Sequence, residues 1–184
     1  MECVIKMKIG IDMDNTICST IEKINEYQKK YIEKEKITLE ELWNTKEHKE
    51  KFLKKYLERI YNEAKLKENA NSTINKLKEC GYKIYIITAR SEKYVSNIYN
   101  IINNYCTKNN FTIDGIFIDA KDKADICKKN KINIMIEDNK YNFDKLTDNN
   151  IKTILYDENN TYNEIDNRIN SWNEYTKIID IINN

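Results

Sequence analysis

Residues 7–16 read Met-Lys-Ile-Gly-Ile-Asp-Met-Asp-Asn-Thr, an apolar run that ends in two aspartates. A short, isoleucine-rich run without regular polar alternation predicts a strand that is buried on both faces of a parallel sheet. Asp12 and Asp14 then emerge at the carboxyl end of this strand, where open α/β sheets bind their ligands. Two carboxylates so close together require a counter-cation.

Four more apolar, β-branched runs follow along the chain, and helical patterns lie between them. The predicted strands after Met7–Ile11 are Ile84–Ile87, Ile116–Ile118, Ile132–Ile136 and Thr153–Tyr156. The predicted helices of this part are Ser72–Cys80 (closed by Gly81), Glu92–Cys106, Ala124–Lys129, Tyr141–Leu146 and, after a polar loop at Asn159–Asn167, a last helix around Ser171–Ile182. Alternating strands and helices predict an α/β fold, a Rossmann-like parallel sheet with helices on both faces.

Residues 18–68 break this alternation because they carry helical patterns only. Ile17, Ile21, Ile24 and Tyr31 recur at helical spacing, as do Phe52, Leu53, Tyr56, Leu57 and Ile60. Between the two patterns, Thr38 and Glu41 have the spacing of a capping box. We expect 1–17 and 69–184 to form the α/β core and 18–68 a small helical cap over the first strand, although a plain helical connection would have the same pattern.

Composition restricts the classes of function. The 184 residues carry 31 basic and 30 acidic side chains, so a net charge of +1 offers no general attraction to nucleic acid or to an anionic membrane. A single histidine and no CxxC pair argue against a zinc site. With no apolar stretch long enough to span a bilayer, we expect a cytoplasmic protein that binds a small molecule; the oligomeric state stays open.

Asp12 and Asp14 alone do not define a function. An EF-hand loop is excluded because Ile17 and Lys23 stand where that motif needs Gly and Glu, whereas a simple turn after a strand remains possible. However, further polar groups follow the other predicted strands: Thr88, Lys123, and the pair Glu137 and Asp138. All of these strand ends share one edge of a parallel sheet, so the set could hold Mg²⁺ and a phosphoryl group together.

Four segments, taken in order, resemble the motifs of the haloacid-dehalogenase superfamily: DMDNT (12–16), YIITAR (85–90) with Thr88, KDKADIC (121–127) with Lys123, and MIEDN (135–139). The short helical insertion, GYKIYIITAR (81–90) and a closing segment with Tyr156, Arg168 and Trp172 are most similar to the 5′(3′)-deoxyribonucleotidase-like nucleotidases.

The resemblance implies a phosphatase in which Asp12 forms an aspartyl-phosphate and Asp14 is the acid and base. It further implies that Thr88 and Lys123 bind the phosphoryl group, and that Asp12, Asp138 and the backbone carbonyl of Asp14 hold Mg²⁺. Asp14 must be protonated when the substrate arrives, a state that we expect the neighbouring Asp12 charge to favour.

Five sites remain open at this stage. Asn15 and Glu137 stand where many relatives have Gly and Asp; Asn tolerates the left-handed backbone, whereas Glu137 is either a metal ligand or a neighbour of one. Lys121 is the alternative to Lys123. Arg90 could contact the substrate or form a surface salt bridge. The cap aromatics could stack on a base or, as is commoner at helical spacing, pack together: Tyr27, Tyr31, Trp43, Phe52 and Tyr56.

The sequence therefore predicts a Mg²⁺-dependent phosphatase acting on a small phosphorylated molecule, with a nucleoside monophosphate preferred. A sugar-phosphate or other metabolite phosphatase is the enzymatic alternative, since one fold serves many substrates. A non-enzymatic phosphate-binding module is the other alternative, but it would have no need of both Asp12 and Asp14. Processing of nucleic-acid ends is disfavoured because no basic run lies beside aromatic residues.

Overall fold

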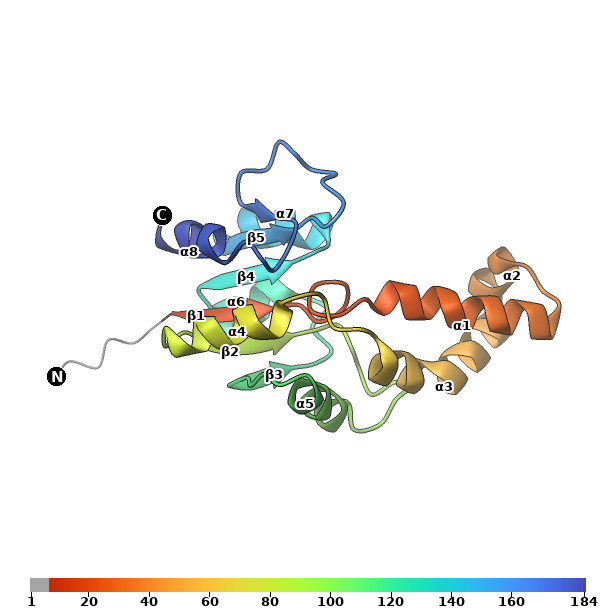
Figure 1. The fold of residues 1–184 in the computed structure, drawn as a ribbon. Helices are drawn as coiled ribbons and strands as arrows, with labels where there is room; N and C mark the ends of the chain where they lie inside the picture. Colours follow the sequence, from red (N-terminus) through yellow and green to blue (C-terminus); the bar gives the residue numbers. More distant parts are fainter. Residues whose placement is uncertain (1–6) are drawn as a thin grey trace.

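The computed structural model describes residues 7–184, and their centre is a parallel sheet in the order β3-β2-β1-β4-β5-β6 (Figure 1). The strands are β1 Lys8–Ile11, β2 Lys83–Ile87, β3 Gly115–Phe117, β4 Ile134–Glu137, β5 Lys152–Tyr156 and β6 Arg168–Ile169. The five strands expected from the sequence are confirmed within two residues at each end. The sixth was missed because two residues are too few to form an apolar pattern.

Alternate residues of the central strands β1, β2 and β4 face two separate hydrophobic clusters. Ile9, Ile84 and Ile134 share one cluster, which includes residues of helices α4 (Ala70–Glu79), α5 (Ile98–Lys108) and α8 (Tyr175–Asn183). Ile87 and Met135 belong to another cluster, with residues of α6 (Lys123–Asn130) and α7 (Lys140–Asp148). Gly10 points toward the second cluster. A Cβ atom there would lie 2.6 Å from Cδ1 of Ile87 and 2.8 Å from Sδ of Met135, so any larger residue would force these two side chains to move.

The core helices follow the expected alternation, with two different boundaries. They are α4 Ala70–Glu79, α5 Ile98–Lys108, α6 Lys123–Asn130, α7 Lys140–Asp148 and α8 Tyr175–Asn183. Helix α5 starts six residues later than the predicted Glu92 because Asn97 adopts a left-handed conformation (φ 57°). Helix α8 starts after Ser171–Glu174, where Trp172 is buried and its indole nitrogen donates to the carbonyl of Thr16 at 2.8 Å.

Helices α1 (Thr20–Glu35), α2 (Leu39–Asn44) and α3 (Lys46–Glu63) project as a lobe beyond the carboxyl end of β1 (Figure 1). The expected capping box is present, since Thr38 and Glu41 bond each other's backbone N–H groups at 3.1 and 2.7 Å. The chain segment that enters the lobe and the segment that leaves it are joined by two hydrogen bonds. Ser19 N donates to the Lys65 carbonyl and Lys67 N donates to the Ile17 carbonyl, both at 2.8 Å. The lobe is where the sequence placed the cap; the boundaries 18–68 remain a prediction.

The cap aromatics pack on one another. Ring centroids lie 5.0 Å apart for Tyr27 and Tyr56, 5.6 Å for Tyr31 and Phe52, and 5.7 Å for Trp43 and Phe52. Four of these side chains are less than a tenth exposed and Trp43 is partly exposed. These side chains therefore form the core of the lobe, as the packing interpretation predicts. They do not present an open face on which a base could stack.

This packing predicts that Phe52→Ala destabilises the protein. Phe52 is fully buried at the centre of the ring cluster, and truncating a buried phenylalanine costs about 3 to 5 kcal/mol. Urea unfolding of the whole chain measures the change in free energy of unfolding. Leu39→Ala, at a side chain that is 53% exposed, is the control and should change it by under about 1 kcal/mol. Equal effects of the two changes would contradict the proposed core.

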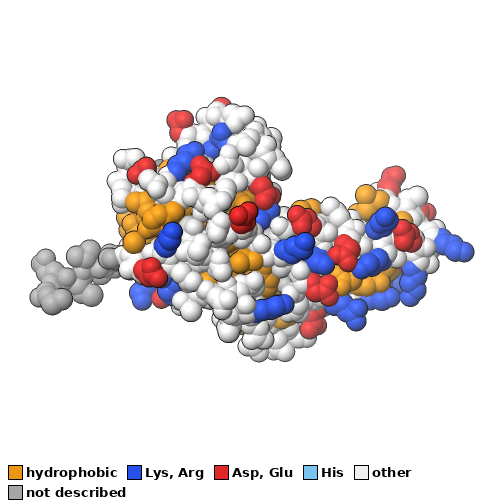
Figure 2. Space-filling view, in the orientation of Figure 1, with side chains coloured by type: hydrophobic (Ala, Val, Ile, Leu, Met, Phe, Trp, Pro, Cys, Tyr) orange, Lys and Arg blue, Asp and Glu red, His pale blue; other side chains and the backbone are white. Residues whose placement is uncertain are grey.

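Basic and acidic side chains are interspersed over the projecting lobe, with hydrophobic atoms between them (Figure 2). Within residues 7–184, no helix combines the length and the apolar character needed to cross a membrane.

Candidate active site

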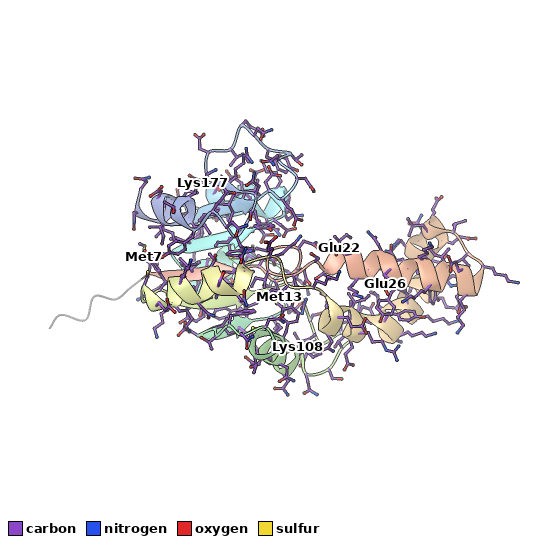
Figure 3. The ribbon with its side chains drawn as sticks, viewed as in Figure 1. Met7, Met13, Glu22, Glu26, Lys108 and Lys177 are labelled. Carbon is purple, nitrogen blue, oxygen red and sulfur yellow. The ribbon has the colours of Figure 1, made fainter. Side chains whose placement is uncertain are left out.

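Asp12 lies directly after β1, between the neighbouring strands β2 and β4. Its backbone N–H donates to the Ile136 carbonyl at 2.9 Å, which extends the β1–β4 pairing by one residue, and the residue is only 5% exposed. Met13 is buried where the sheet meets the projecting helices, as Figure 3 shows. The chain turns at Asn15, whose φ of 62° confirms that asparagine serves here as a left-handed turn residue. Asn15 also accepts a 2.9 Å hydrogen bond from Ile21 N, at the start of α1.

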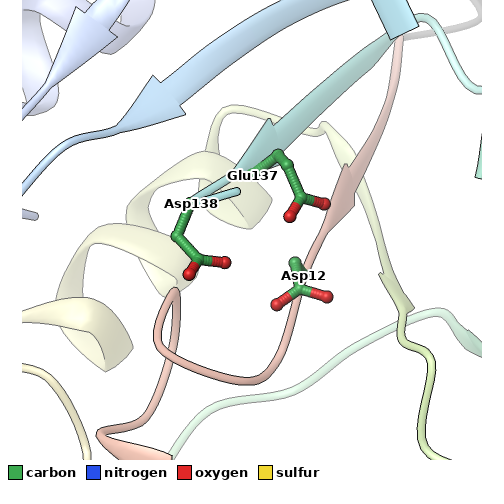
Figure 4. A group of neighbouring side chains, drawn as sticks. All are labelled: Asp12, Glu137 and Asp138. Atoms are coloured by element: carbon green, nitrogen blue, oxygen red, sulfur yellow. The ribbon is translucent and has the colours of Figure 1, made fainter. Parts of the chain in front are cut away.

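Three carboxylates converge at this edge: those of Asp12, Glu137 and Asp138 (Figure 4). One oxygen from each lies within 4.8 Å of the others. Thr16 joins two of them, since its hydroxyl donates to Asp138 at 3.1 Å and lies 3.5 Å from Asp12. The sequence expectation that the β1 and β4 ends meet is borne out, and Glu137 belongs to the cluster.

Lys123, the first residue of α6, extends its side chain into this cluster of carboxylates. Its ammonium group donates to the Asp12 carboxylate in a very short contact and to Glu137 at 2.6 Å. Burial alone would lower the pKa of Lys123, but the two carboxylates raise it above its usual value, so the side chain stays charged. Lys121 is 84% exposed and pairs with Asp119, so Lys123 is the lysine at the site.

Negative charge at the cluster is only partly compensated. Three carboxylates and one ammonium group sum to −3 + 1 = −2 when all are ionised. Burial raises the pKa of Asp12 well above its ordinary value, against the attraction of Lys123. Burial, with a contribution from Glu137, also raises the pKa of Asp138 to about 6. An oxygen-lined, buried site with two uncompensated charges fits a hard divalent cation.

Glu137 is fixed differently from the other two acids. Besides Lys123, its carboxylate accepts hydrogen bonds from Asn139 N and Asn142 Nδ2, both at 3.2 Å. Among residues 7–184, Asp138 has one side-chain hydrogen-bond partner, Thr16, and it borders a cavity of about 320 Å³ that is also lined by Lys67 and Tyr162. The carboxylate of Asp138 is therefore less constrained by hydrogen bonds than that of Glu137.

Thr88 directly follows β2, the strand that pairs with β1, and is fully buried. Its hydroxyl oxygen accepts from Arg90 N at 3.2 Å, and its own N–H donates to the Phe117 carbonyl at 3.0 Å. Accepting that bond uses an oxygen lone pair. The hydroxyl hydrogen can therefore be donated to a phosphoryl oxygen.

Asp14 is not part of the acidic cluster, because its carboxylate is paired with Arg90. The guanidinium donates from Nη2 at 2.7 Å and from Nε at 3.1 and 3.2 Å. Burial raises the pKa of Asp14, but Arg90 and Thr20 outweigh it, and the net pKa is lower than usual. The expectation that Asp12 would favour the protonated form is wrong for this arrangement.

Arg90 is the site residue that the sequence underestimated. It is 2% exposed, which excludes the surface salt bridge considered for it. Its position two residues after Thr88 was the available signal, but burial depends on α3, which is distant in the sequence.

Comparisons with known proteins agree with this geometry. The model of the family described as 5′ nucleotidase, deoxy (pyrimidine), cytosolic type C protein matches residues 6–183. No curated protein sequence gives a significant match.

Solved structures share the fold at low identity. A predicted phosphatase from Clostridium acetobutylicum has a TM-score of 0.70 and 19% identity over 95% of this chain and 99% of its own. A β-phosphoglucomutase from Clostridium difficile has a TM-score of 0.67 and 17% identity over 97% of both chains. A haloacid-dehalogenase hydrolase from Entamoeba histolytica has a TM-score of 0.64 and 20% identity over 97% of this chain and all of its own.

The family match, which spans nearly the whole chain, agrees with the ordered motifs and with the acidic cluster after β1. The chain has the fold of the haloacid-dehalogenase hydrolases, and it belongs to the cytosolic type C family of deoxy (pyrimidine) 5′ nucleotidases, which makes it a phosphoric monoester hydrolase.

Proposed function

We propose that the protein is a Mg²⁺-dependent 5′-nucleotidase that hydrolyses nucleoside monophosphates through an aspartyl-phosphate on Asp12. The observation that carries the proposal is the buried contact of Lys123 with Asp12, inside a carboxylate cluster that lacks two positive charges. A nucleophilic carboxylate needs this arrangement, because attack on a phosphate dianion brings like charges together. The family description supplies the substrate class.

In the first step, a carboxylate oxygen of Asp12 bonds to phosphorus as the bond from phosphorus to the nucleoside oxygen breaks. Asp14 gives a proton to that leaving oxygen. In the second step, water attacks the phosphorus of the aspartyl-phosphate and Asp14 takes a proton from it, which releases inorganic phosphate and restores Asp12. Arg90 pairs with the ionised form of Asp14, the form that the second step needs; the first step proceeds from the protonated form, which Arg90 makes the less populated one.

The remaining residues of the site bind or orient charged groups. Lys123 fixes the orientation of the Asp12 carboxylate, and the Thr88 hydroxyl donates to a phosphoryl oxygen. Asp12, Asp138 and the Asp14 carbonyl would hold Mg²⁺, which when bound supplies positive charge against the phosphoryl group. Glu137 keeps Lys123 in place. The cavity beside Asp138, at about 320 Å³, can admit part of a small substrate. A cytoplasmic location, which the family description suggests, belongs to the proposal.

Release of inorganic phosphate from a panel of nucleoside monophosphates and sugar phosphates tests the substrate class. We expect Mg²⁺-dependent release with the highest kcat/KM for a deoxynucleoside monophosphate. Higher kcat/KM for sugar phosphates would replace the nucleotidase with a general metabolite phosphatase. No release from any compound by folded protein would restore the binding-module alternative.

Metal binding is tested without turnover by thermal unfolding with and without Mg²⁺. A ligand that binds only the folded state stabilises it by about 2.7 kcal/mol at 100 times its Kd. We therefore expect Mg²⁺ to raise the melting temperature of the wild type and, much less, that of Asp138→Asn. Asp144→Asn, at an exposed residue of α7, should respond as the wild type does. If Mg²⁺ raises the melting temperature of Asp138→Asn as much as that of the wild type, Asp138 is not a ligand. If Mg²⁺ leaves the melting temperature of the wild type unchanged, the Mg²⁺ site is excluded.

A further inference from the structure

The guanidinium of Arg90 donates several hydrogen bonds to the carboxylate of Asp14. Nε contacts both carboxylate oxygens, at 3.2 and 3.1 Å, and Nη2 donates to Oδ1 at 2.7 Å. The hydroxyl of Thr20, the first residue of α1, donates to the same Oδ1 atom at 2.5 Å. The side chain of Asp14 is 29% exposed, so the gripped carboxylate still faces the mouth of the site.

The other side of the guanidinium lies against the projecting lobe. Its Cζ atom is 4.0 Å from the ring centroid of Tyr61 on α3, which is the distance of a cation–π contact. Within residues 7–184, Nη1 of Arg90 is buried and has no hydrogen-bond partner. Arg90 therefore joins the end of β2, the Asp14 loop and α3 in one contact.

Stability is a weak explanation for this arrangement. Burying an arginine and an aspartate costs solvation that their attraction barely offsets, and here one donor group is left without a partner as well. A planar fork does, however, fix the direction of a carboxylate, which a lysine cannot do. The group that is fixed is the one that has to reach both the leaving oxygen and the attacking water.

We propose that Arg90 is a positioning residue that orients Asp14 for proton transfer, and that Tyr61 of the lobe holds Arg90 in place. The inference rests on the proposed role of Asp14 as acid and base. Arg90 acts on the reaction through the Asp14 carboxylate that it contacts. Its contribution should therefore be felt only when Asp14 is present.

A double-mutant cycle isolates this contribution. Arg90→Lys keeps the charge and removes the fork, while Asp14→Asn removes the transferable proton. With p-nitrophenyl phosphate and Mg²⁺, we expect Arg90→Lys to lower kcat by about 10- to 100-fold, part of the 10²- to 10⁴-fold effect of an acid–base group, with KM within about 2-fold. In the Asp14→Asn background, the same change should lower kcat by less than about 2-fold.

Variants of the lobe give a second test if Arg90→Lys does not fold. Tyr61→Leu removes the ring and should lower kcat only when Asp14 is present, whereas Tyr61→Phe keeps the ring and should not. Arg59→Lys, at an exposed arginine of α3, is the matched control for Arg90→Lys. Thermal unfolding of each variant shows whether the fold is retained.

The outcomes separate the possible roles. Equal losses of kcat with and without Asp14 would make Arg90 a structural residue, and a raised KM with unchanged kcat would make it a substrate contact; either result overturns the proposal. If Asp14→Asn alone keeps the wild-type kcat, the proposed function of Asp14 fails. If Asp14→Asn is slow but both Arg90→Lys and Tyr61→Leu are not, only the inference about Arg90 fails.

Discussion

Replacing Asp12 with asparagine is expected to lower kcat by about 10⁴-fold or more, because an amide cannot form the aspartyl-phosphate. Asparagine keeps the size of the side chain and an oxygen that can accept from Lys123, which retains Glu137 as a partner. The residual rate of Asp12→Asn should not show the dependence on the leaving group of the substrate that the wild-type rate shows. Phosphate release from the best substrate of the panel, at saturating Mg²⁺, measures the loss.

The same change should leave the fold intact and can stabilise it. Burial holds the pKa of Asp12 well above its ordinary value, so the ionised carboxylate is destabilising in the metal-free protein. Removing one of the two uncompensated charges should leave the melting temperature of the metal-free protein equal to or above that of the wild type. Asp144→Asn, at an exposed carboxylate, should keep kcat within about 2-fold. A kcat for Asp12→Asn within tenfold of wild type would rule out Asp12 as the nucleophile.

Replacing Lys123 with methionine is expected to destabilise the folded protein strongly. The ammonium group is 6% exposed and lies between Asp12 and Glu137. Without it the buried cluster holds three carboxylates and no cation, and removing one partner of a buried ion pair costs about 3 to 5 kcal/mol. Urea unfolding without Mg²⁺ measures the loss, and kcat should fall as well because the orientation of Asp12 is no longer fixed.

Two comparisons test the electrostatic cause. Mg²⁺ should restore part of the stability of Lys123→Met, and so should Glu137→Gln in the same chain, because each reduces the excess negative charge. Lys121→Met removes an exposed lysine from the same loop and should change the free energy of unfolding by under about 0.5 kcal/mol. Lys123→Met that is as stable as wild type in the absence of metal would show that the buried contact contributes nothing to stability.

Local sequence patterns were sufficient to predict how strands and helices alternate in the core. Five strands, their alternation with helices and the position of Asp12 and Asp138 at one sheet edge followed from apolar runs and from chain order, because a parallel sheet places the carboxyl ends of its strands together. The capping box of α2 also depends on residues close in sequence. The start of α5 was missed because a single left-handed residue, Asn97, interrupts an otherwise helical pattern.

The sequence by itself thus determined five of the six strands, the order of the four motifs and the identity of the residues that meet after β1 and β4. The tertiary structure decided which lysine enters the cluster, that Glu137 is held by that lysine, that the lobe aromatics face one another, and that Arg90 is buried against Asp14 and Tyr61. The reason is physical: periodicity reports which side chains leave water, whereas the partner of a buried charge depends on desolvation and on contacts between segments far apart in the chain.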